Sequence, residues 1–247
     1  MSSLTEQEII RYSRHIILPE VGGRGQKKLK SASVLVAGVG AAGSAAALYL
    51  AAAGIGKLTL WDPGLVTLQD LTGAIAHDRS RIGLPRARSA ARPLRAINPD
   101  ATVDVLDRES DVAGWIPEHE ILLASAGDWA GFAKLSYAGG TSAVLYGVHG
   151  AHGAVGTFRP GAPCPDCLGD ERARAAGLSP EAGGGEAIAA AAGVVGVMAA
   201  TEAIKLILGI GRPLTGRVLA YDGWAATFAE TEFGERPGCP VCGGETK

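Results

Sequence analysis

The amino-acid sequence predicts an α/β protein with a doubly wound, mostly parallel sheet and an antiparallel extension. Three observations lead to this class. Apolar runs of strand length alternate with segments of helical periodicity as far as residue 147. A glycine loop joins the first apolar run to a helical segment, and the composition is 47% apolar and 19% charged with 36 glycines. A chain of 247 residues has ample room for one core.

We expect a single domain over residues 1–247, beginning with a helical arm over residues 1–30. Thr5 and Glu8 have the spacing of a capping box, in which each side chain bonds to the other residue's backbone N–H. The pattern therefore predicts a short helix that carries Ile9 to His15.

The nucleotide-binding core is expected over residues 31–147, where strands and helices alternate. The predicted strands are Ser33–Gly38, Lys57–Asp62, Thr102–Leu106, Glu120–Ser125 and Ser142–Tyr146. The predicted helices between them are Gly43–Ala53, which ends at Gly54, and Arg86–Ile97. Pro93 should kink or shorten the second helix, because proline has no N–H to donate.

The pattern changes in the final part, residues 148–247, which is expected to hold the antiparallel extension, a metal site and a carrier-binding region. A hairpin is predicted over His149–Arg159, and Ile188–Thr201 reads as a buried helix, shorter than the roughly 20 residues that span a bilayer. The stretch Gly177–Glu186 has few apolar residues, which predicts a segment that is mobile or ordered only by a ligand or partner.

The four cysteines of the chain form two pairs, Cys164-Pro-Asp-Cys167 and Cys239-Pro-Val-Cys242. Two such turns brought together supply four thiolates, the ligand set of a closed structural zinc site. The alternative is a pair of redox dithiols, but such a dithiol normally opens a helix, and a proline inside each pair disfavours that arrangement. Zinc in this site would leave no cysteine for nucleophilic chemistry.

A second motif, Gly38-Val-Gly-Ala-Ala-Gly43, lies between a predicted strand and a predicted helix. Glycines at these positions let the backbone approach a phosphate, while the helix amino terminus offers free N–H groups. Asp62 follows about 20 residues later, at the end of the next strand, where a carboxylate can bind ribose hydroxyls. These residues by themselves fit NAD, FAD or another adenine nucleotide equally, and a packing turn without a ligand is the alternative.

The wider pattern resembles the ThiF/MoeB/HesA adenylyltransferases, relatives of the ubiquitin-activating enzymes. The matching segments run in order nearly from end to end: Arg11–Pro19, the glycine loop, Tyr49–Asp62, Ile97–Pro99, both cysteine pairs, Glu202–Lys205 and Gly216–Asp222. The resemblance implies a Rossmann-like, ubiquitin-activating-enzyme-like fold and a homodimer. It also implies that Mg-ATP is used to adenylate the carboxy-terminal Gly-Gly of a small ubiquitin-like sulfur carrier, with release of pyrophosphate.

Carried onto this chain, the resemblance assigns three residues to catalysis: Arg14, which would reach into the partner's ATP site, Arg86 and Asp128. Without the resemblance, an arginine on a short helix such as Arg14 is usually a solvated charge. The nucleotide-binding set that the resemblance implies is Gly38, Gly40, Ala41, Gly43, Asp62, Gln69 and Asp70.

Several positions depart from the family pattern. The second acid after the second strand is Gly64, the phosphate-binding arginine is Gly73, and the glutamine after it is Ala74. Asp70 stands for an asparagine, and Arg86 stands for a lysine, so a planar fork replaces a compact ammonium.

The magnesium-binding aspartate aligns with Gly127, or with Asp128 after a shift of one residue. Asp128 could equally cap the helix that follows. The family's loop cysteine is also absent, because residues 182–186 read Ala-Gly-Gly-Gly-Glu.

The sequence therefore predicts an ATP-dependent adenylyltransferase that activates a carrier protein, a peptide or a small-molecule acid. The alternative is a catalytically impaired relative that serves as a dimeric binding scaffold, and a nicotinamide oxidoreductase has only the glycine loop and Asp62 in its favour. The formal net charge of −2 gives no general attraction to nucleic acid or to anionic membranes. Zinc-bound cysteines and a polar amino terminus favour the cytoplasm.

Overall fold

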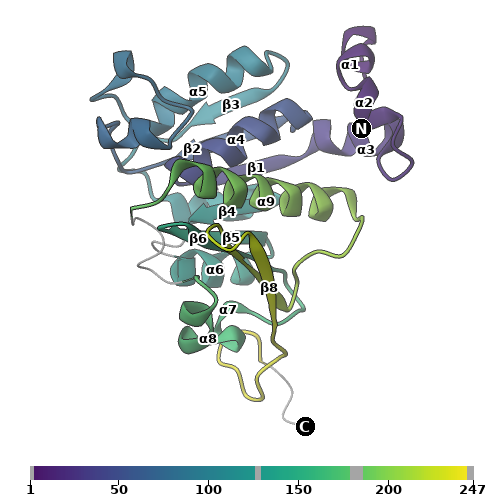
Figure 1. Cartoon of the computed structure of the whole chain (residues 1–247). Coiled ribbons are helices and arrows are strands. Elements are labelled where there is room, and N and C mark those ends of the chain that lie inside the picture. Colours follow the sequence, from purple (N-terminus) through teal and green to yellow (C-terminus); the bar gives the residue numbers. More distant parts are fainter. Residues whose placement is uncertain (1–2, 126–128, 179–185, 244–247) are drawn as a thin grey trace.

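The fold is described by a computed structural model for residues 3–125, 129–178 and 186–243 (Figure 1). Its centre is an eight-stranded sheet in the order β3-β2-β1-β4-β5-β6-β7-β8. The neighbours from β3 to β5 pair in parallel, and those from β5 to β8 pair antiparallel. The strands are β1 (Ser33–Ala37), β2 (Lys57–Trp61), β3 (Thr102–Val105), β4 (Ile121–Ser125), β5 (Ser142–His149), β6 (His152–Phe158), β7 (Arg217–Asp222) and β8 (Thr227–Glu232). The predicted fold class is confirmed.

Helices cover both faces of this sheet, with α4, α5 and α9 on one face and α6, α7 and α8 on the other (Figure 1). The α-helices are α1 (Glu6–Arg11), α2 (Ser13–Ile16), α3 (Gly22–Ser31), α4 (Ala41–Ala53), α5 (Arg86–Ile97), α6 (Trp129–Ala138), α7 (Pro165–Leu168), α8 (Asp170–Ala175) and α9 (Ala189–Leu208). The described residues also form short 3-10 helices, η1 (Gln69–Thr72), η2 (Arg79–Arg81) and η3 (Val112–Glu118).

The central strand β1 shows how the sequence produces two cores. Side chains alternate along a strand, so Val34 and Val36 pack into the cluster under α4, α5 and α9. Leu35 and Ala37 pack into the second cluster, which also contains Phe132 and buried cysteines. All four side chains are at most 2% exposed, as expected for a parallel strand covered on both faces.

The chain leaves β1 for β2 on one side and later enters β4 on the other side of β1. This reversal is the topological switch point of a doubly wound sheet, and ligands bind outside the carboxyl ends of the strands there. The glycine loop begins at the end of β1, so the fold places it at this crevice.

The long helix α9 differs from its prediction in length, because it extends beyond Thr201 to Leu208 and has 20 residues. Within the described residues it is the one helix long and apolar enough to cross a membrane by length and composition, yet 56% of its most apolar window is buried inside the protein. Its neighbours are α4, β5 and β6, which is the packing of a core helix.

Helix α5 continues through Pro93, so the predicted shortening is wrong. Proline at this position cannot donate to the carbonyl oxygen of Ser89, four residues earlier. The guanidinium of Arg81 donates to that oxygen instead, at 2.6 Å from Nη1. The side chain of another element thus replaces the missing helix bond.

The predicted strand Ser142–Tyr146 and the predicted hairpin form one unit. Strand β5 continues to His149, and it turns at Gly150 directly into β6. The hairpin therefore begins before the predicted start at His149, because the preceding residues of β5, including Gly147 and Val148, already pair with β6.

The predicted capping box is confirmed: Thr5 Oγ1 accepts from Glu8 N–H at 3.2 Å, and Glu8 Oε2 accepts from Thr5 N–H at 2.7 Å. The arm is attached to the core through Asn98, which donates to Tyr12 Oη at 3.0 Å and to the carbonyl oxygen of Ala51 at 2.9 Å. Two of the segments that resemble the family are therefore structural partners.

Candidate functional site

The glycine loop closes tightly at the switch point between β1 and α4. Gly38 has a φ of +99°, a conformation that favours glycine. A Cβ on Gly43 would overlap the carbonyl oxygen of Gly38 and lie 2.9 Å from Tyr146 Oη. Helix α4 begins with Gly40 as its N-cap and no side-chain cap, so its first N–H groups face the crevice without a capping side chain. The loop therefore has the backbone geometry that phosphate binding requires.

Asp62 is buried at the end of β2 and holds the loop in place. Its Oδ2 accepts from the N–H of Val39 at 2.8 Å, and its Oδ1 accepts from the N–H of Gly64 at 2.7 Å. Each carboxylate oxygen has a second lone pair, so a ribose hydroxyl could still bind. The predicted ribose contact stays a prediction, and the structure adds a loop-anchoring contact.

Arg86, the first residue of α5, forms a two-point ion pair with Asp70 of η1. Nη2 lies 2.8 Å from Asp70 Oδ1, and Nε lies 3.1 Å from Oδ2. Burial alone would raise the pKa of Asp70, but hydrogen bonds from Thr67 and the charge of Arg86 together lower it below its ordinary value. Asp70 is therefore a carboxylate at neutral pH.

These groups surround a cavity of about 780 Å³, within the size range of small-molecule sites. Its wall includes all seven residues predicted to bind a nucleotide, namely Gly38, Gly40, Ala41, Gly43, Asp62, Gln69 and Asp70, together with Arg86. The charged side chains in the described part of the wall are three acids and one base: Asp62, Asp70, Glu186 and Arg86.

Two residues that the sequence analysis missed support the loop from behind. His77 is buried, and its Nε2 lies 3.1 Å from the carbonyl oxygen of Val39 while Nδ1 lies 2.9 Å from Ser89 Oγ. Burial lowers the pKa of His77, which favours the neutral ring. Tyr146 donates from Oη to the carbonyl oxygen of Gly38 at 3.3 Å, and burial, with the charge of Asp62, raises its pKa. No local motif marks either residue, because each acts across the fold.

The departures from the family pattern have structural consequences. A Cβ on Gly64 would lie 2.6 Å from Arg86 Nη1, so the guanidinium occupies the space where a side chain at position 64 would begin. Gly73 faces Ala41, and a Cβ there would lie 3.1 Å from that methyl group. Ala74 is buried.

Of the three predicted catalytic residues, Arg86 is in the described cavity wall. Arg14 is exposed on α2 of the arm and is not part of the wall of this subunit's cavity. Asp128 and Gly127 lie outside the described residues, as does most of the predicted loop Gly177–Glu186. Its last residue, Glu186, is described, and its carbonyl oxygen accepts from the N–H of Gly150 at 2.7 Å.

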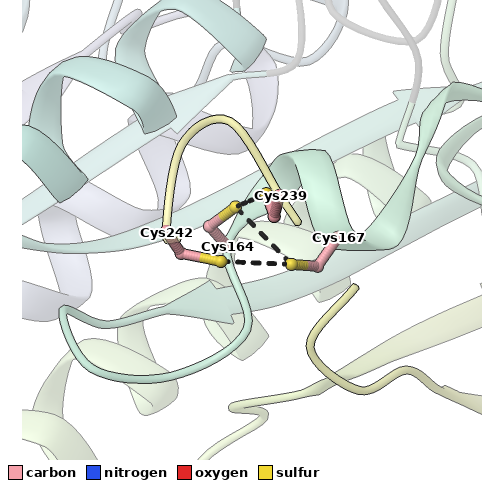
Figure 2. A group of neighbouring side chains, drawn as sticks. All are labelled: Cys164, Cys167, Cys239 and Cys242. Atoms are coloured by element: carbon pink, nitrogen blue, oxygen red, sulfur yellow. Dashed lines mark hydrogen bonds between the residues drawn. The ribbon is translucent and has the colours of Figure 1, made fainter. Parts of the chain in front are cut away.

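The four cysteines are not among the residues that line the cavity, and they gather with their sulfurs directed toward one another (Figure 2). All four Sγ atoms lie within 4.8 Å of one another. Three of the separations are 3.8 Å for Cys164–Cys167, 3.5 Å for Cys164–Cys239 and 3.4 Å for Cys167–Cys242. Zn–S bonds of about 2.3 Å in a tetrahedron place the sulfurs about 3.8 Å apart, so this cluster fits a zinc ion.

The surroundings act differently on individual thiols of the cluster. Burial opposes ionisation of Cys239, but the backbone N–H groups of Cys242 and Val241 outweigh it and lower its pKa to about 6. The N–H of Arg236 points at Cys167 Sγ, 3.3 Å away. Burial raises the pKa of Cys164, which a metal ion would reverse.

The first cysteine pair does begin a helix, contrary to the expectation that its proline would prevent this. Cys164 is the N-cap of the short helix α7, and Pro165 occupies its first position. Proline is favoured there because the first N–H of a helix has no partner within the helix. The approach of the second pair supports a metal site over a separate redox dithiol.

Comparison with known proteins identifies relatives across the whole length. The model of the ThiF family matches residues 12–241. Molybdopterin-synthase adenylyltransferase of Escherichia coli K12 is 36% identical over 252 residues, covering 98% of this chain and 100% of that protein. The SAMP-activating enzyme E1 of Haloferax volcanii is 36% identical over 250 residues, covering 98% and 91%. The sulfur carrier protein adenylyltransferase of Thermus thermophilus is 34% identical over 256 residues, covering 98% and 93%.

Solved structures agree with the fold. The crystal structure of Escherichia coli MccB with ATP superposes with a TM-score of 0.81 at 22% identity, covering 94% of this chain and 73% of that one. A likeness at this identity concerns the fold alone.

Proposed function

Because this chain belongs to the ThiF family, we propose that it is an ATP-dependent adenylyltransferase that converts a carboxylate into an acyl-adenylate. The observation that carries the proposal is the cavity at the switch point, where the glycine loop, Asp62 and Arg86 meet. Its volume suits a nucleotide together with the end of a flexible peptide. The sequence relatives are named as enzymes that adenylate or activate carrier proteins, which supports an acid of that kind.

The reaction requires little covalent chemistry from the protein itself. An oxygen of the substrate carboxylate attacks the α-phosphorus, the bond from that phosphorus to the bridging oxygen breaks, and pyrophosphate leaves with the bond's electron pair. Negative charge grows on the phosphate oxygens during this step, so a fixed cation beside the glycine loop lowers the barrier. Arg86 is the cationic side chain that the described wall provides for this role.

Magnesium would accompany ATP and offset charge on its phosphates. Asp62 is predicted to bind the ribose, and Asp70 is paired with Arg86, so we assign neither residue to the metal. Asp128 remains the predicted magnesium ligand.

We further propose a homodimer in which Arg14 of each subunit completes the partner's cavity. A cavity with three acids and one base among its described charges needs additional positive charge before it can bind a nucleotide triphosphate. The arm that carries Arg14 exposes large apolar side chains, with Ile10 75% and Ile17 76% exposed, which suits an interface. The metal-type cluster of four cysteines supports a reducing compartment such as the cytoplasm.

The proposal is tested by pyrophosphate–ATP exchange. Purified protein is offered peptides that end in Gly-Gly and small-molecule acids, and the exchange of labelled pyrophosphate into ATP is measured. Replacing Arg86 by Ala should lower exchange about 10²–10³-fold, as loss of one preorganised donor to developing charge does. The matched control is Arg88→Ala, an exposed arginine on the same helix, which should stay near wild type. No exchange with any acid, together with no ATP binding, would exclude the proposal.

A second candidate, a binding scaffold without catalysis, is favoured by one observation. The cation of the described wall is already paired with an acid, and Gly73 supplies no second cation. A scaffold would bind a carrier protein equally well with or without ATP, and Arg86→Ala would not change that binding.

A further inference from the structure

Both members of the ion pair between Arg86 and Asp70 are held in place by hydrogen bonds. Asp70 is itself fixed by Thr67, whose N–H lies 2.7 Å and whose hydroxyl lies 2.9 Å from Oδ2. The side chains of Asp70 and Arg86 are 14% and 27% exposed, so the pair is shielded from bulk water. A guanidinium held at two points by a fixed carboxylate loses the rotational freedom that a long side chain normally keeps.

This pairing leaves a defined part of the guanidinium unused. In the described residues, the side-chain hydrogen bonds of Arg86 run through Nε and Nη2, while Nη1 only approaches Asp62 Oδ1 at 3.6 Å. Arg86 borders the cavity, so both N–H groups of Nη1 and the second N–H of Nη2 remain as donors for a ligand.

Gly64 provides the space that this orientation needs. A Cβ at position 64 would lie 2.6 Å from Arg86 Nη1 and 3.0 Å from Asp62 Oδ1. The φ of Gly64 lies outside the left-handed region, so the need for glycine comes from space and not from backbone conformation. The backbone is tied at the same place, because the N–H of Arg86 donates to the carbonyl oxygen of Gly64 at 3.0 Å.

We propose that Asp70 is a positioning residue that presents Nη1 of Arg86 to the nucleotide phosphates, and that Gly64 is required because it leaves room for that orientation. The inference rests on the proposed adenylyl transfer and adds the way in which its cation is oriented. Asp70 acts through Arg86 and not on the ligand directly, which makes the two residues separable by experiment.

The first test does not depend on activity. Heteronuclear NMR detects the side-chain Nε–H of Arg86, assigned by its loss in Arg86→Lys. In the wild type this Nε–H should be protected from exchange with water, because it donates to Asp70. Protection should fall at least about tenfold in Asp70→Asn and in Gly64→Ala. Gly114→Ala is the matched glycine control, since a Cβ there meets nothing within 4 Å. Unchanged protection in Asp70→Asn would overturn the proposal.

The second test is a double-mutant cycle on pyrophosphate exchange. Asp70→Asn should lower kcat about tenfold or more without raising the KM for ATP, because a misplaced Arg86 no longer stabilises charge that develops mainly in the transition state. In an Arg86→Lys background, which has no two-point pair to lose, the same substitution should cost less than about threefold. The control is Asp78→Asn, which breaks an Asp–Arg pair with Arg81 outside the cavity wall.

An equal loss from Asp70→Asn in both backgrounds would mean that Asp70 acts on the ligand directly, and this would refute the positioning role. An increase in kcat would refute it too, since it would show that Asp70 withholds Arg86 from the phosphates. If the wild type neither exchanges pyrophosphate nor binds ATP, the proposed function fails, and the NMR measurement still decides whether Asp70 orients Arg86.

Discussion

Gly43 is the residue at which the phosphate-binding loop depends most on the absence of a side chain. A Cβ there would overlap the carbonyl oxygen of Gly38 and crowd Tyr146. We expect Gly43→Ala to lower the free energy of unfolding by the upper end of about 1–3 kcal/mol, because backbone must move to admit the methyl group. Urea denaturation measures this loss.

The comparison within the same loop is Gly40→Ala. A Cβ at Gly40 meets nothing within 4 Å, and its φ is −69°. Because Gly40 is the N-cap of α4, the substitution Gly40→Ala should lower the free energy of unfolding by less than about 1 kcal/mol. Equal losses at both positions would contradict the steric explanation for Gly43.

At the residue scale, the sequence locates residues best where one residue type implies one chemistry. The glycine loop, Asp62 and the four cysteines lie where their motifs indicate. His77 and Tyr146 were not predicted as loop supports, because their partners are carbonyl oxygens that any residue could provide.

Among the elements, α9 packs against α4, the helix that follows the glycine loop, and so supports the loop. Gly196 of α9 lies against α4, where a Cβ would overlap the carbonyl oxygen of Ala42 and lie 2.9 Å from Ala45 Cβ. Gly193, one turn earlier, meets nothing within 4 Å. Position 196 therefore requires a glycine, whereas position 193 has room for a side chain.

We expect Gly196→Ala to destabilise the protein by about 1–3 kcal/mol, since the helices must separate. Gly193→Ala should instead stabilise it by about 0.5–1 kcal/mol, because alanine favours helix over glycine. Chemical denaturation of both variants measures the sign. A loss of stability in Gly193→Ala similar to that in Gly196→Ala would show that the packing described for α9 is wrong.

The cysteine cluster joins α7 to the segment that follows β8. We expect one zinc ion per chain, measured by elemental analysis of the purified protein. Its removal by a chelator should lower Tm by about 5 °C or more, since each kcal/mol shifts Tm by about 2–4 °C for a chain of this size.

The control for the zinc prediction is Cys164→Ser, which replaces a fully buried ligand. This variant should contain little zinc, and the chelator should then have no further effect on its Tm. A wild-type Tm that does not change on chelation would argue against a structural metal.

At the scale of the whole molecule, the proposed dimer makes a prediction that no single chain can satisfy. Each cavity would use its own Arg86 and the partner's Arg14, so Arg14→Ala and Arg86→Ala should each be nearly inactive in pyrophosphate exchange. When equal amounts of the two variants are mixed under conditions of subunit exchange, about half of the dimers should contain one subunit of each variant. One of the two cavities in each mixed dimer is then complete, so about a quarter of wild-type activity should return.

The mixture of Arg88→Ala with Arg86→Ala serves as the control. It should show only the activity that Arg88→Ala subunits contribute, with no gain on subunit exchange. Failure of the two inactive variants to complement each other would place Arg14 outside the partner's cavity.

The sequence by itself determined the fold class, the glycine-loop and cysteine motifs and the family, because strand and helix periods, turn chemistry and cysteine spacing depend on near neighbours in the chain. Only the tertiary structure decided which distant side chains meet. Arg86 pairs with Asp70 in the space left by Gly64, and Arg81 replaces the helix bond that Pro93 cannot make. Such contacts depend on how packed elements place their side chains in space, and no local pattern in the sequence encodes those distances.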